Sequence, residues 1–263
     1  MTTGQAIILG LFQGLGEFLP VSSSAHLVLV PWLFHWEDPG LTFDIALHIG
    51  TLIAVIIYFW KDWLRLVMRG FTAPGTMDGR LFWYLVIATV PGAIIGYAFE
   101  KKAETIFRTP LLIAVTLIVM GAILYWAERK SAKKDDLSNI TLRTSLLIGL
   151  SQALAIIPGV SRSGITMTTG LFSGLSREAA ARFSFLLSTP IILGAAIIKV
   201  PYLVRHPDVI DANFLIGMVV AFIAGIASIS FLLRYVQTKT FLPFVWYRFA
   251  VGALVIIIIN IRP

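Results

Sequence analysis

Six long apolar runs divide most of the chain, and charged connections separate them. A transmembrane helix needs about 20 consecutive apolar residues to cross the hydrocarbon core of a bilayer. Tryptophan and tyrosine residues gather at or near the ends of these runs, as in an interfacial aromatic belt. We therefore predict six membrane-spanning helices, near residues 41–60, 81–99, 110–127, 183–203, 214–235 and 244–261.

Two further apolar segments, near residues 4–34 and 142–172, are interrupted halfway. Pro20 breaks the first segment and Pro158 breaks the second, and polar residues follow each proline. Neither arm alone reaches the length of a span. Irregular backbone at membrane depth persists only where it is buried in protein or lines a wet cavity. Two interpretations fit: each segment is a re-entrant hairpin that returns to its own side, or each is one broken span.

The two interrupted segments are versions of one another, because identical residues recur at a constant offset of 139. Weaker similarity extends along the chain and divides it into two repeats, residues 1–130 and 131–263, within one membrane domain. With hairpins, each repeat has three spans, so the second repeat is inverted. The predicted fold class is an all-α polytopic membrane protein, an inverted repeat with about six transmembrane helices plus two re-entrant helical hairpins. The positions of the first segment that recur in the second are Gly10, Leu11, Gln13, Leu15, Val21, Ser22 and Ser24.

Composition supports the membrane assignment and argues against a soluble protein, cysteine chemistry and nucleic-acid binding. The chain is 57% hydrophobic and 13% charged, with a mean hydropathy of +0.86, whereas soluble domains carry about 25% charged residues. There is no cysteine, so neither disulfides nor thiolate chemistry are available. The net charge of +7 comes mainly from loop residues, where topology and anionic headgroups account for it. We therefore predict no nucleic-acid partner.

The distribution of basic loop residues predicts the orientation in the membrane. With hairpins, one side holds 13 Lys and Arg residues and the other holds six. With broken spans, the counts become 12 and seven. Because cytoplasmic loops are enriched in Lys and Arg, the hairpin interpretation is favoured and both termini are predicted outside. The two hairpins then enter from opposite faces and meet near the midplane.

The first hairpin carries candidate metal-binding and catalytic groups. Gln13 and Glu17 lie four residues apart on one helix face, and an intramembrane carboxylate is costly and usually functional. Such an oxygen pair suits a hard divalent cation, Mg²⁺ or Ca²⁺, with phosphate oxygens and water completing the shell. His26 follows the serine turn and is a candidate base or nucleophile; the alternative is a hydrogen-bonded structural histidine.

The second hairpin carries a candidate anion site centred on Arg162. A guanidinium in an apolar region needs an anionic partner, and its geometry matches phosphate bidentately. Gly159 permits close backbone approach, and a helix starting near Ser163 directs free N–H groups at the same anion. The alternative is a structural salt bridge from Arg162 to Glu17 or Asp44. The remaining intramembrane polar residues, Asp44, His48 and Arg248 among them, are interpreted mainly as structural or supporting groups.

These motifs resemble those of the undecaprenyl pyrophosphate phosphatase family, the bacitracin-resistance type. Gln13-x3-Glu17 is followed by Phe-Leu-Pro-Val-Ser-Ser, and the second half contains Pro-Gly-Val-Ser-Arg-Ser-Gly-Ile-Thr. The resemblance covers the full length and implies a divalent-cation requirement. It assigns Gln13 and Glu17 to a (Glu/Gln)-x3-Glu motif, in which Gln13 is the neutral variant with fewer negative charges for the metal. Ala25 stands where a glycine often occurs.

The resemblance also implies roles for the hydroxyl-rich turns. Ser23 and His26 occupy the catalytic serine and histidine positions. Catalysis is then expected from Glu17, Ser23, His26 and Arg162. The residues expected to bind the substrate are Ser22, Gly159, Ser161, Arg162, Ser163 and Thr166.

The implied activity is hydrolysis of undecaprenyl diphosphate, a polyprenyl diphosphate lipid, to undecaprenyl phosphate and inorganic phosphate. This reaction regenerates a carrier lipid for cell-wall synthesis at the bacterial plasma membrane, and we expect the active site to open to the outer face. The nucleophile is either Ser23, activated by His26 or Glu17, or a water held by the same groups. The alternative function is a lipid-phosphate flippase or transporter, since inverted repeats with midplane hairpins are also transporter architecture.

Overall fold

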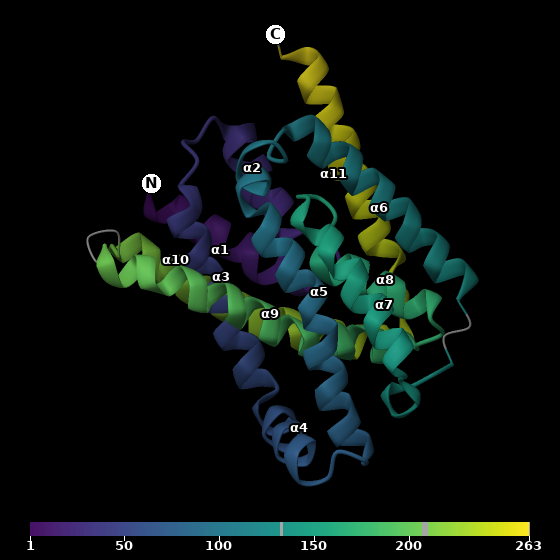
Figure 1. The fold of residues 1–263 in the computed structure, drawn as a ribbon. Helices are drawn as coiled ribbons and strands as arrows, with labels where there is room; N and C mark the ends of the chain where they lie inside the picture. Colours follow the sequence, from purple (N-terminus) through teal and green to yellow (C-terminus); the bar gives the residue numbers. More distant parts are fainter. Residues whose placement is uncertain (132–133, 207–209, 263) are drawn as a thin grey trace.

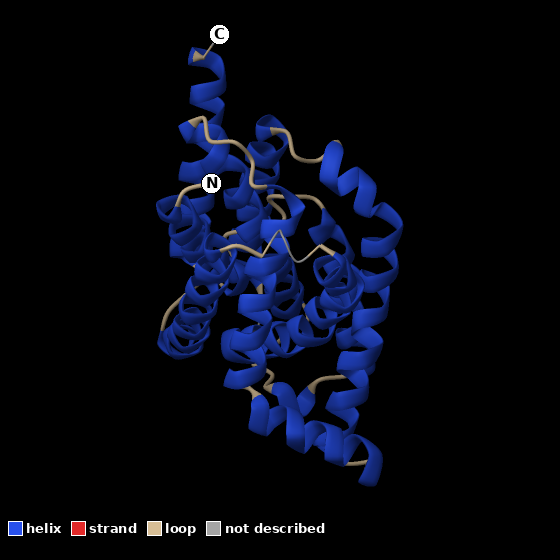
Figure 2. Cartoon of the chain, turned by 90° about the vertical axis from the view of Figure 1, so that its left-hand side faces the viewer, coloured by secondary structure: helices blue, strands red, loops and turns tan. Residues whose placement is uncertain are grey.

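The computed structural model describes residues 1–131, 134–206 and 210–262, and the fold of this part is helical throughout. Figures 1 and 2 show a bundle of helices of very different lengths, with no strand in the ranges just given. Two short 3₁₀ turns, η1 (Leu137–Asn139) and η2 (Ala153–Ile156), flank α7. The helices are α1 (Thr3–Phe18), α2 (Ser23–Phe34), α3 (Gly40–Tyr58), α4 (Trp60–Thr72), α5 (Met77–Thr105), α6 (Pro110–Lys130), α7 (Leu142–Gln152), α8 (Arg162–Phe172), α9 (Arg177–Arg205), α10 (Ala212–Thr238) and α11 (Leu242–Ile261).

Every predicted span coincides with a long apolar helix. Within the described residues, α5, α6, α9, α10 and α11 are each long and apolar enough to cross a bilayer alone. The sixth, α3, meets the same criterion together with α4, from which a bend of 72° separates it. Since water cannot satisfy exposed backbone in the hydrocarbon core, helices of this kind are the way an all-helical chain crosses a membrane. The protein is an all-helical, multi-pass membrane protein, as predicted.

Helix α4 was not predicted from the sequence, because residues 61–80 fall in the charged connection between the predicted spans 41–60 and 81–99. It lies at the lower end of α3 and α5 in Figure 1. Of its residues only Leu66 and Gly70 are buried, while large apolar side chains such as Trp60, Leu64 and Phe71 are exposed. Its basic residues depress the average hydropathy of the segment. The signal that would have found it is apolar residues recurring every three to four positions.

Both interrupted segments break where the prolines predicted. The first break, between α1 and α2, ends at Ser22 (φ 74°); the second, between η2 and α8, contains Gly159 (φ 93°) and ends at Ser161 (φ 70°). The two arms of the first segment, α1 and α2, fold back on one another: the rings of Phe12 and His26 stack with 5.0 Å between their centroids. Apolar residues of both arms also share one buried cluster. The geometry is that of a helical hairpin rather than one continuous bent span.

Arg248 of α11 joins the two hairpin turns at the centre of the molecule. Its side chain is fully buried. It donates hydrogen bonds to the carbonyl of Pro20 (3.1 Å) in the first turn, and to those of Gly159 and Val160 (2.8 Å for the latter) in the second. Broken helices leave carbonyl groups without intrahelical partners, and a buried guanidinium can satisfy several of them at once. Arg248 therefore has the structural role that the sequence analysis expected, with backbone carbonyls as its partners.

The two turns also bind one another directly. The N–H of Gly159 donates to Oγ of Ser22 at 3.1 Å, and Oγ of Ser163 donates to the carbonyl of Leu19 at 3.0 Å. Each hairpin thus supplies a serine from the start of its second helix to the turn of the other. This reciprocal arrangement sets the first residues of α2 and α8 face to face.

Candidate active site

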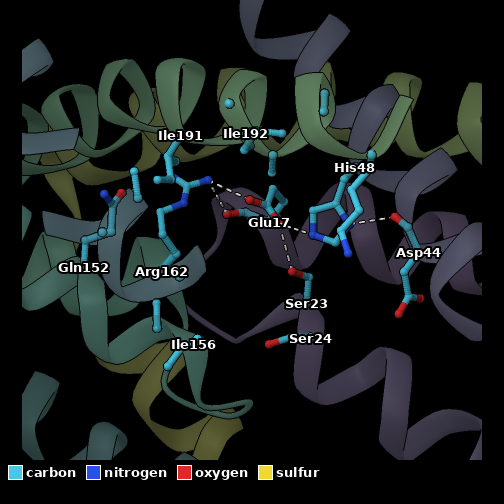
Figure 3. A pocket seen from close by; sticks show the side chains of 18 of the residues that line it. Glu17, Ser23, Ser24, Asp44, His48, Gln152, Ile156, Arg162, Ile191 and Ile192 are labelled. Atoms are coloured by element: carbon cyan, nitrogen blue, oxygen red, sulfur yellow. Dashed lines mark hydrogen bonds and ion pairs between the residues drawn. The ribbon is translucent and has the colours of Figure 1, made fainter. Parts of the chain in front are cut away.

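A pocket of about 510 Å³ opens where the two hairpins meet α3, α5 and α9. Its wall is largely apolar, formed by residues such as Ile156, Ile191 and Ile192, and its polar groups gather at one place (Figure 3). Because a polar group buried among apolar residues is costly unless it is bonded, such a concentration marks a functional site. The polar side chains of the wall include Glu17, Ser23, Ser24, Asp44, His48, Gln152, Ser161 and Arg162.

Glu17, in the last turn of α1, is the centre of this group. Its Oε1 accepts a hydrogen bond from Nη2 of Arg162 at 2.8 Å, which joins the two repeats by an ion pair. Its Oε2 accepts from Nε2 of Gln13 and from Oγ of Ser23, both at 3.0 Å. Nε2 of His48 lies 3.9 Å from the same oxygen. The carboxylate is 8% exposed, so these partners substitute for water.

Arg162 is the first residue of α8 and faces the pocket. One terminal nitrogen, Nη1, donates to the carbonyl of Ser184 at 3.0 Å, while Nη2 holds Glu17. The sequence left open a structural salt bridge from Arg162 to either Glu17 or Asp44, and the structure contains the one to Glu17. Asp44 pairs with Arg108 at 3.4 Å instead. This ion pair does not exclude an anion site, because the guanidinium carries five donors and lines the pocket.

The other predicted substrate-binding residues divide into two groups. Ser161 lines the pocket and caps α8, its Oγ accepting from the N–H of Gly164 at 3.0 Å. Ser22, Gly159 and Ser163 use their polar groups in the contacts between the turns described above. Thr166 donates to the carbonyl of Arg162 at 2.8 Å and lies 2.7 Å from Oγ of Ser184. These four residues hold the turns and the start of α8, and they do not line the pocket.

His26 lies outside the pocket wall, in an aromatic stack between Phe12 and Tyr247. Its Nδ1 donates to the carbonyl of Ser22 at 2.7 Å, and its Nε2 lies 2.7 Å from the hydroxyl of Tyr247. In a neutral histidine this leaves Nε2 as the acceptor, so both ring nitrogens are occupied. The structure brings Ser23 to Glu17 and does not bring it to His26.

The chain that carries this site matches a known protein family over almost its whole length. The model described as bacitracin resistance protein BacA matches residues 6–254. The chain belongs to this family. Its relatives include the undecaprenyl-diphosphatase of Moorella thermoacetica, 56% identical over 262 residues that cover 100% of both chains. The undecaprenyl-diphosphatase of Pelotomaculum thermopropionicum is also 56% identical, over 100% of this chain and 98% of its own. That of Desulforudis audaxviator is 54% identical over 100% of both.

Several polar residues of the pocket wall were not among the predicted site residues, notably Asp44, His48 and Gln152. Asp44 and His48, one helical turn apart on α3, were interpreted as structural, yet both line the pocket and His48 approaches Glu17. Their presence in an apolar span was a usable signal, since ionisable groups within membrane helices are functional by default. Gln152 was noted only as the counterpart of Gln13 in the repeat.

The oxygen atoms around Glu17 are of the types that a divalent cation binds. Among the residues described here, no three His, Cys, Asp or Glu side chains form a metal-binding group. The protein therefore offers few ligands, and a metal site must rely on phosphate oxygens and water, as Mg²⁺ sites commonly do. Oε1 of Gln13 is buried without a hydrogen-bond partner in the described structure, beside the carboxylate of Glu17. An amide oxygen and a carboxylate are the donor types that a hard cation takes.

Proposed function

We propose that this protein hydrolyses undecaprenyl diphosphate to undecaprenyl phosphate and inorganic phosphate, recycling the carrier lipid for cell-wall synthesis. The observation that carries the proposal is the cluster of Arg162, Glu17 and Ser23 inside an otherwise apolar pocket. This cluster supplies a cation for phosphate oxygens, a hydroxyl nucleophile and a carboxylate that accepts its hydrogen bond. The full-length relatives named undecaprenyl-diphosphatase support the same reaction and disfavour a flippase.

The shape of the pocket matches an amphiphilic substrate. The diphosphate lies against Arg162, and the first isoprenoid units contact the apolar wall formed by α5 and α9. The undecaprenyl tail is far longer than the pocket, so the rest of it extends between helices into lipid. Removing the head group from water strengthens its interaction with Arg162.

Chemistry at the site follows from the contacts of Glu17 and Ser23. The hydroxyl of Ser23 attacks the terminal phosphorus, Glu17 accepts its proton, and the bond from that phosphorus to the bridging oxygen breaks. Undecaprenyl phosphate leaves with the bridging oxygen. Water then cleaves the phosphoserine ester, releasing phosphate and restoring the serine hydroxyl. Arg162 stabilises the equatorial oxygens in both steps. Direct attack by water, the alternative nucleophile, would leave no phosphoserine, which acid quenching with labelled substrate tests.

The proposed reaction also requires a divalent cation, Mg²⁺ or Ca²⁺. Glu17 and Oε1 of Gln13 would hold it, after the pair that they form with one another is rearranged. When bound, such an ion supplies positive charge to the phosphate oxygens.

The proposed activity is tested by phosphate release from purified protein in detergent. We expect release from undecaprenyl diphosphate that depends on divalent cation and is abolished by chelation. Movement of the lipid across liposome membranes without phosphate release would instead identify a flippase.

We further propose that the protein lies in the bacterial plasma membrane with both termini outside and the pocket open to the outer face. The repeats, residues 1–130 and 131–263, are then inverted. Helix α4, with Lys61, Arg65 and Arg69, lies at the cytoplasmic interface, where basic residues concentrate. The pocket is lined by the start of α3 and by the later parts of α5 and α9, all of which lead to the predicted outer side. Figure 1 places both termini away from α4.

Single cysteines test this topology, because the chain has none of its own. We expect an impermeant thiol reagent to label cysteines at Thr3, Pro39 and Pro263 in intact spheroplasts, and a cysteine at Ser131 only after lysis. Labelling at position 3 without labelling at position 39 would eliminate the first re-entrant hairpin.

A further inference from the structure

Gln152 is a buried amide that lacks hydrogen-bond partners. It is the last residue of α7, is 4% exposed and lines the pocket. Neither Nε2 nor Oε1 has a partner in the parts of the chain that the structure describes. Buried polar groups are almost always hydrogen-bonded, and the exceptions in native structures need an explanation such as a ligand.

The internal repeat explains why this amide is unpartnered. Its counterpart in the first hairpin is Gln13, whose Nε2 donates to the carboxylate of Glu17 four residues later. Four residues after Gln152 stands Ile156, which offers no acceptor. The second repeat therefore keeps the amide and lacks the group that would occupy it.

The amide of Gln152 lies in the pocket that also contains the charged groups of the site. Gly92 of α5 lies against it, since a Cβ at position 92 would be 2.7 Å from Nε2 of Gln152. Arg162 and Ser161 line the same pocket, and Figure 3 shows Gln152 and Glu17 on opposite sides of Arg162. An isoprenoid tail contains no acceptor for an N–H group. A phosphate oxygen held by Arg162 is an acceptor, and a charged one.

We propose that Gln152 is a substrate-binding residue whose amide N–H donates to a phosphate oxygen of the diphosphate held by Arg162. This inference rests on the proposed phosphatase function and adds a neutral donor to its anion site. The two related glutamines then have different tasks. Gln13 supports the carboxylate side of the site, and Gln152 contacts the substrate on the side of the guanidinium.

Gln152→Met tests the proposal, because methionine has a similar length and no donor. We expect kcat/KM for undecaprenyl diphosphate to fall about 10- to 100-fold, the range for a lost hydrogen bond to a charged group. Affinity for inorganic pyrophosphate, a probe without a tail, should fall in parallel. The melting temperature in detergent should stay equal or rise, because an unsatisfied buried amide has been removed. Gln237→Met, at an exposed glutamine of α10, is the matched control and should change neither activity nor affinity.

A second variant moves the side-chain amide of Gln152 and leaves the residue itself unchanged. Gly92→Ala places a methyl group at the position now close to Nε2, so we expect weaker pyrophosphate binding than in Gly4→Ala, whose Cβ would make only an ordinary van der Waals contact with Oγ1 of Thr2 at 3.9 Å. Wild-type kcat/KM in Gln152→Met would overturn the proposal and show that the amide is hydrated and does not contact the substrate. A fall in activity matched by a fall in melting temperature would also overturn it, since that is the signature of a structural role. If the unaltered protein releases no phosphate, the proposed function itself fails.

Discussion

Replacing Arg162 separates its two contributions, to folding and to substrate binding. In the structure its guanidinium holds both the carboxylate of Glu17 (2.8 Å) and the carbonyl of Ser184 (3.0 Å). Arg162→Ala leaves a buried carboxylate without its cation, which costs about 3–5 kcal/mol of stability. Lost activity in that variant alone would therefore be ambiguous.

Arg162→Lys avoids this ambiguity, because it keeps a positive charge near Glu17 and removes the planar fork. We expect a stability loss of about 1–2 kcal/mol, the value of one or two hydrogen bonds. The loss of transition-state stabilisation should be larger, about 3–4 kcal/mol or roughly 100- to 1,000-fold in kcat/KM, as for removal of one donor to a developing oxyanion. The free energy lost from transition-state stabilisation should thus exceed the free energy lost from folding.

The assay combines phosphate release with thermal unfolding in the same detergent. Adding Glu17→Gln to the wild type and to Arg162→Ala completes a double-mutant cycle. The coupling energy for stability should be about 1–3 kcal/mol, as for residues in direct contact. Near wild-type kcat/KM in Arg162→Lys would refute the bidentate role of this residue in binding phosphate.

Three further predictions concern the groups around this pair. Glu17→Gln should lose metal-dependent activity far more than Gln13→Ala, because only Glu17 brings charge to the cation; metal titration of both variants decides this, and equal losses would contradict it. Arg248→Met should lower the melting temperature strongly, since each buried carbonyl left unsatisfied costs about 1–3 kcal/mol; an unchanged melting temperature would contradict its role in joining the turns. Tyr247→Phe removes a hydrogen bond of His26, so we expect a stability loss of about 1 kcal/mol with little change in kcat/KM; a large loss of activity at unchanged stability would place His26 in the chemistry.

The sequence alone determined the properties that depend on local patterns. Apolar runs of sufficient length predicted the five helices that are long enough to span a bilayer alone, and also α3, which meets the criterion only together with α4, because hydropathy and helix length must match the bilayer. Pro20 and Pro158 predicted both breaks, because proline removes a backbone donor and clashes with the preceding turn. The repeated motifs also identified the family, which the match over residues 6–254 confirms.

The sequence did not reveal α4, and it did not decide among the possible partners of the buried polar groups, such as Glu17 or Asp44 for Arg162. Average hydropathy hides an amphipathic helix, whose basic residues offset its apolar ones. The choice of Glu17 over His26 as the partner of Ser23 was likewise open, since both lie within a few residues of it.

Only tertiary structure decided which groups meet, because the pairs that make the site are distant in the chain. Glu17 and Arg162 are 145 residues apart, and Arg248 reaches turns 89 and 228 residues away. Local sequence sets backbone conformation, whereas the packing of α1 on α10 and of α8 on α9, together with the hydrogen bonds of Arg248 to both turns, sets these distances. The partner of Gln13 is local, because Glu17 follows it by four residues, whereas only the tertiary structure places Gln152 in the same pocket as Arg162.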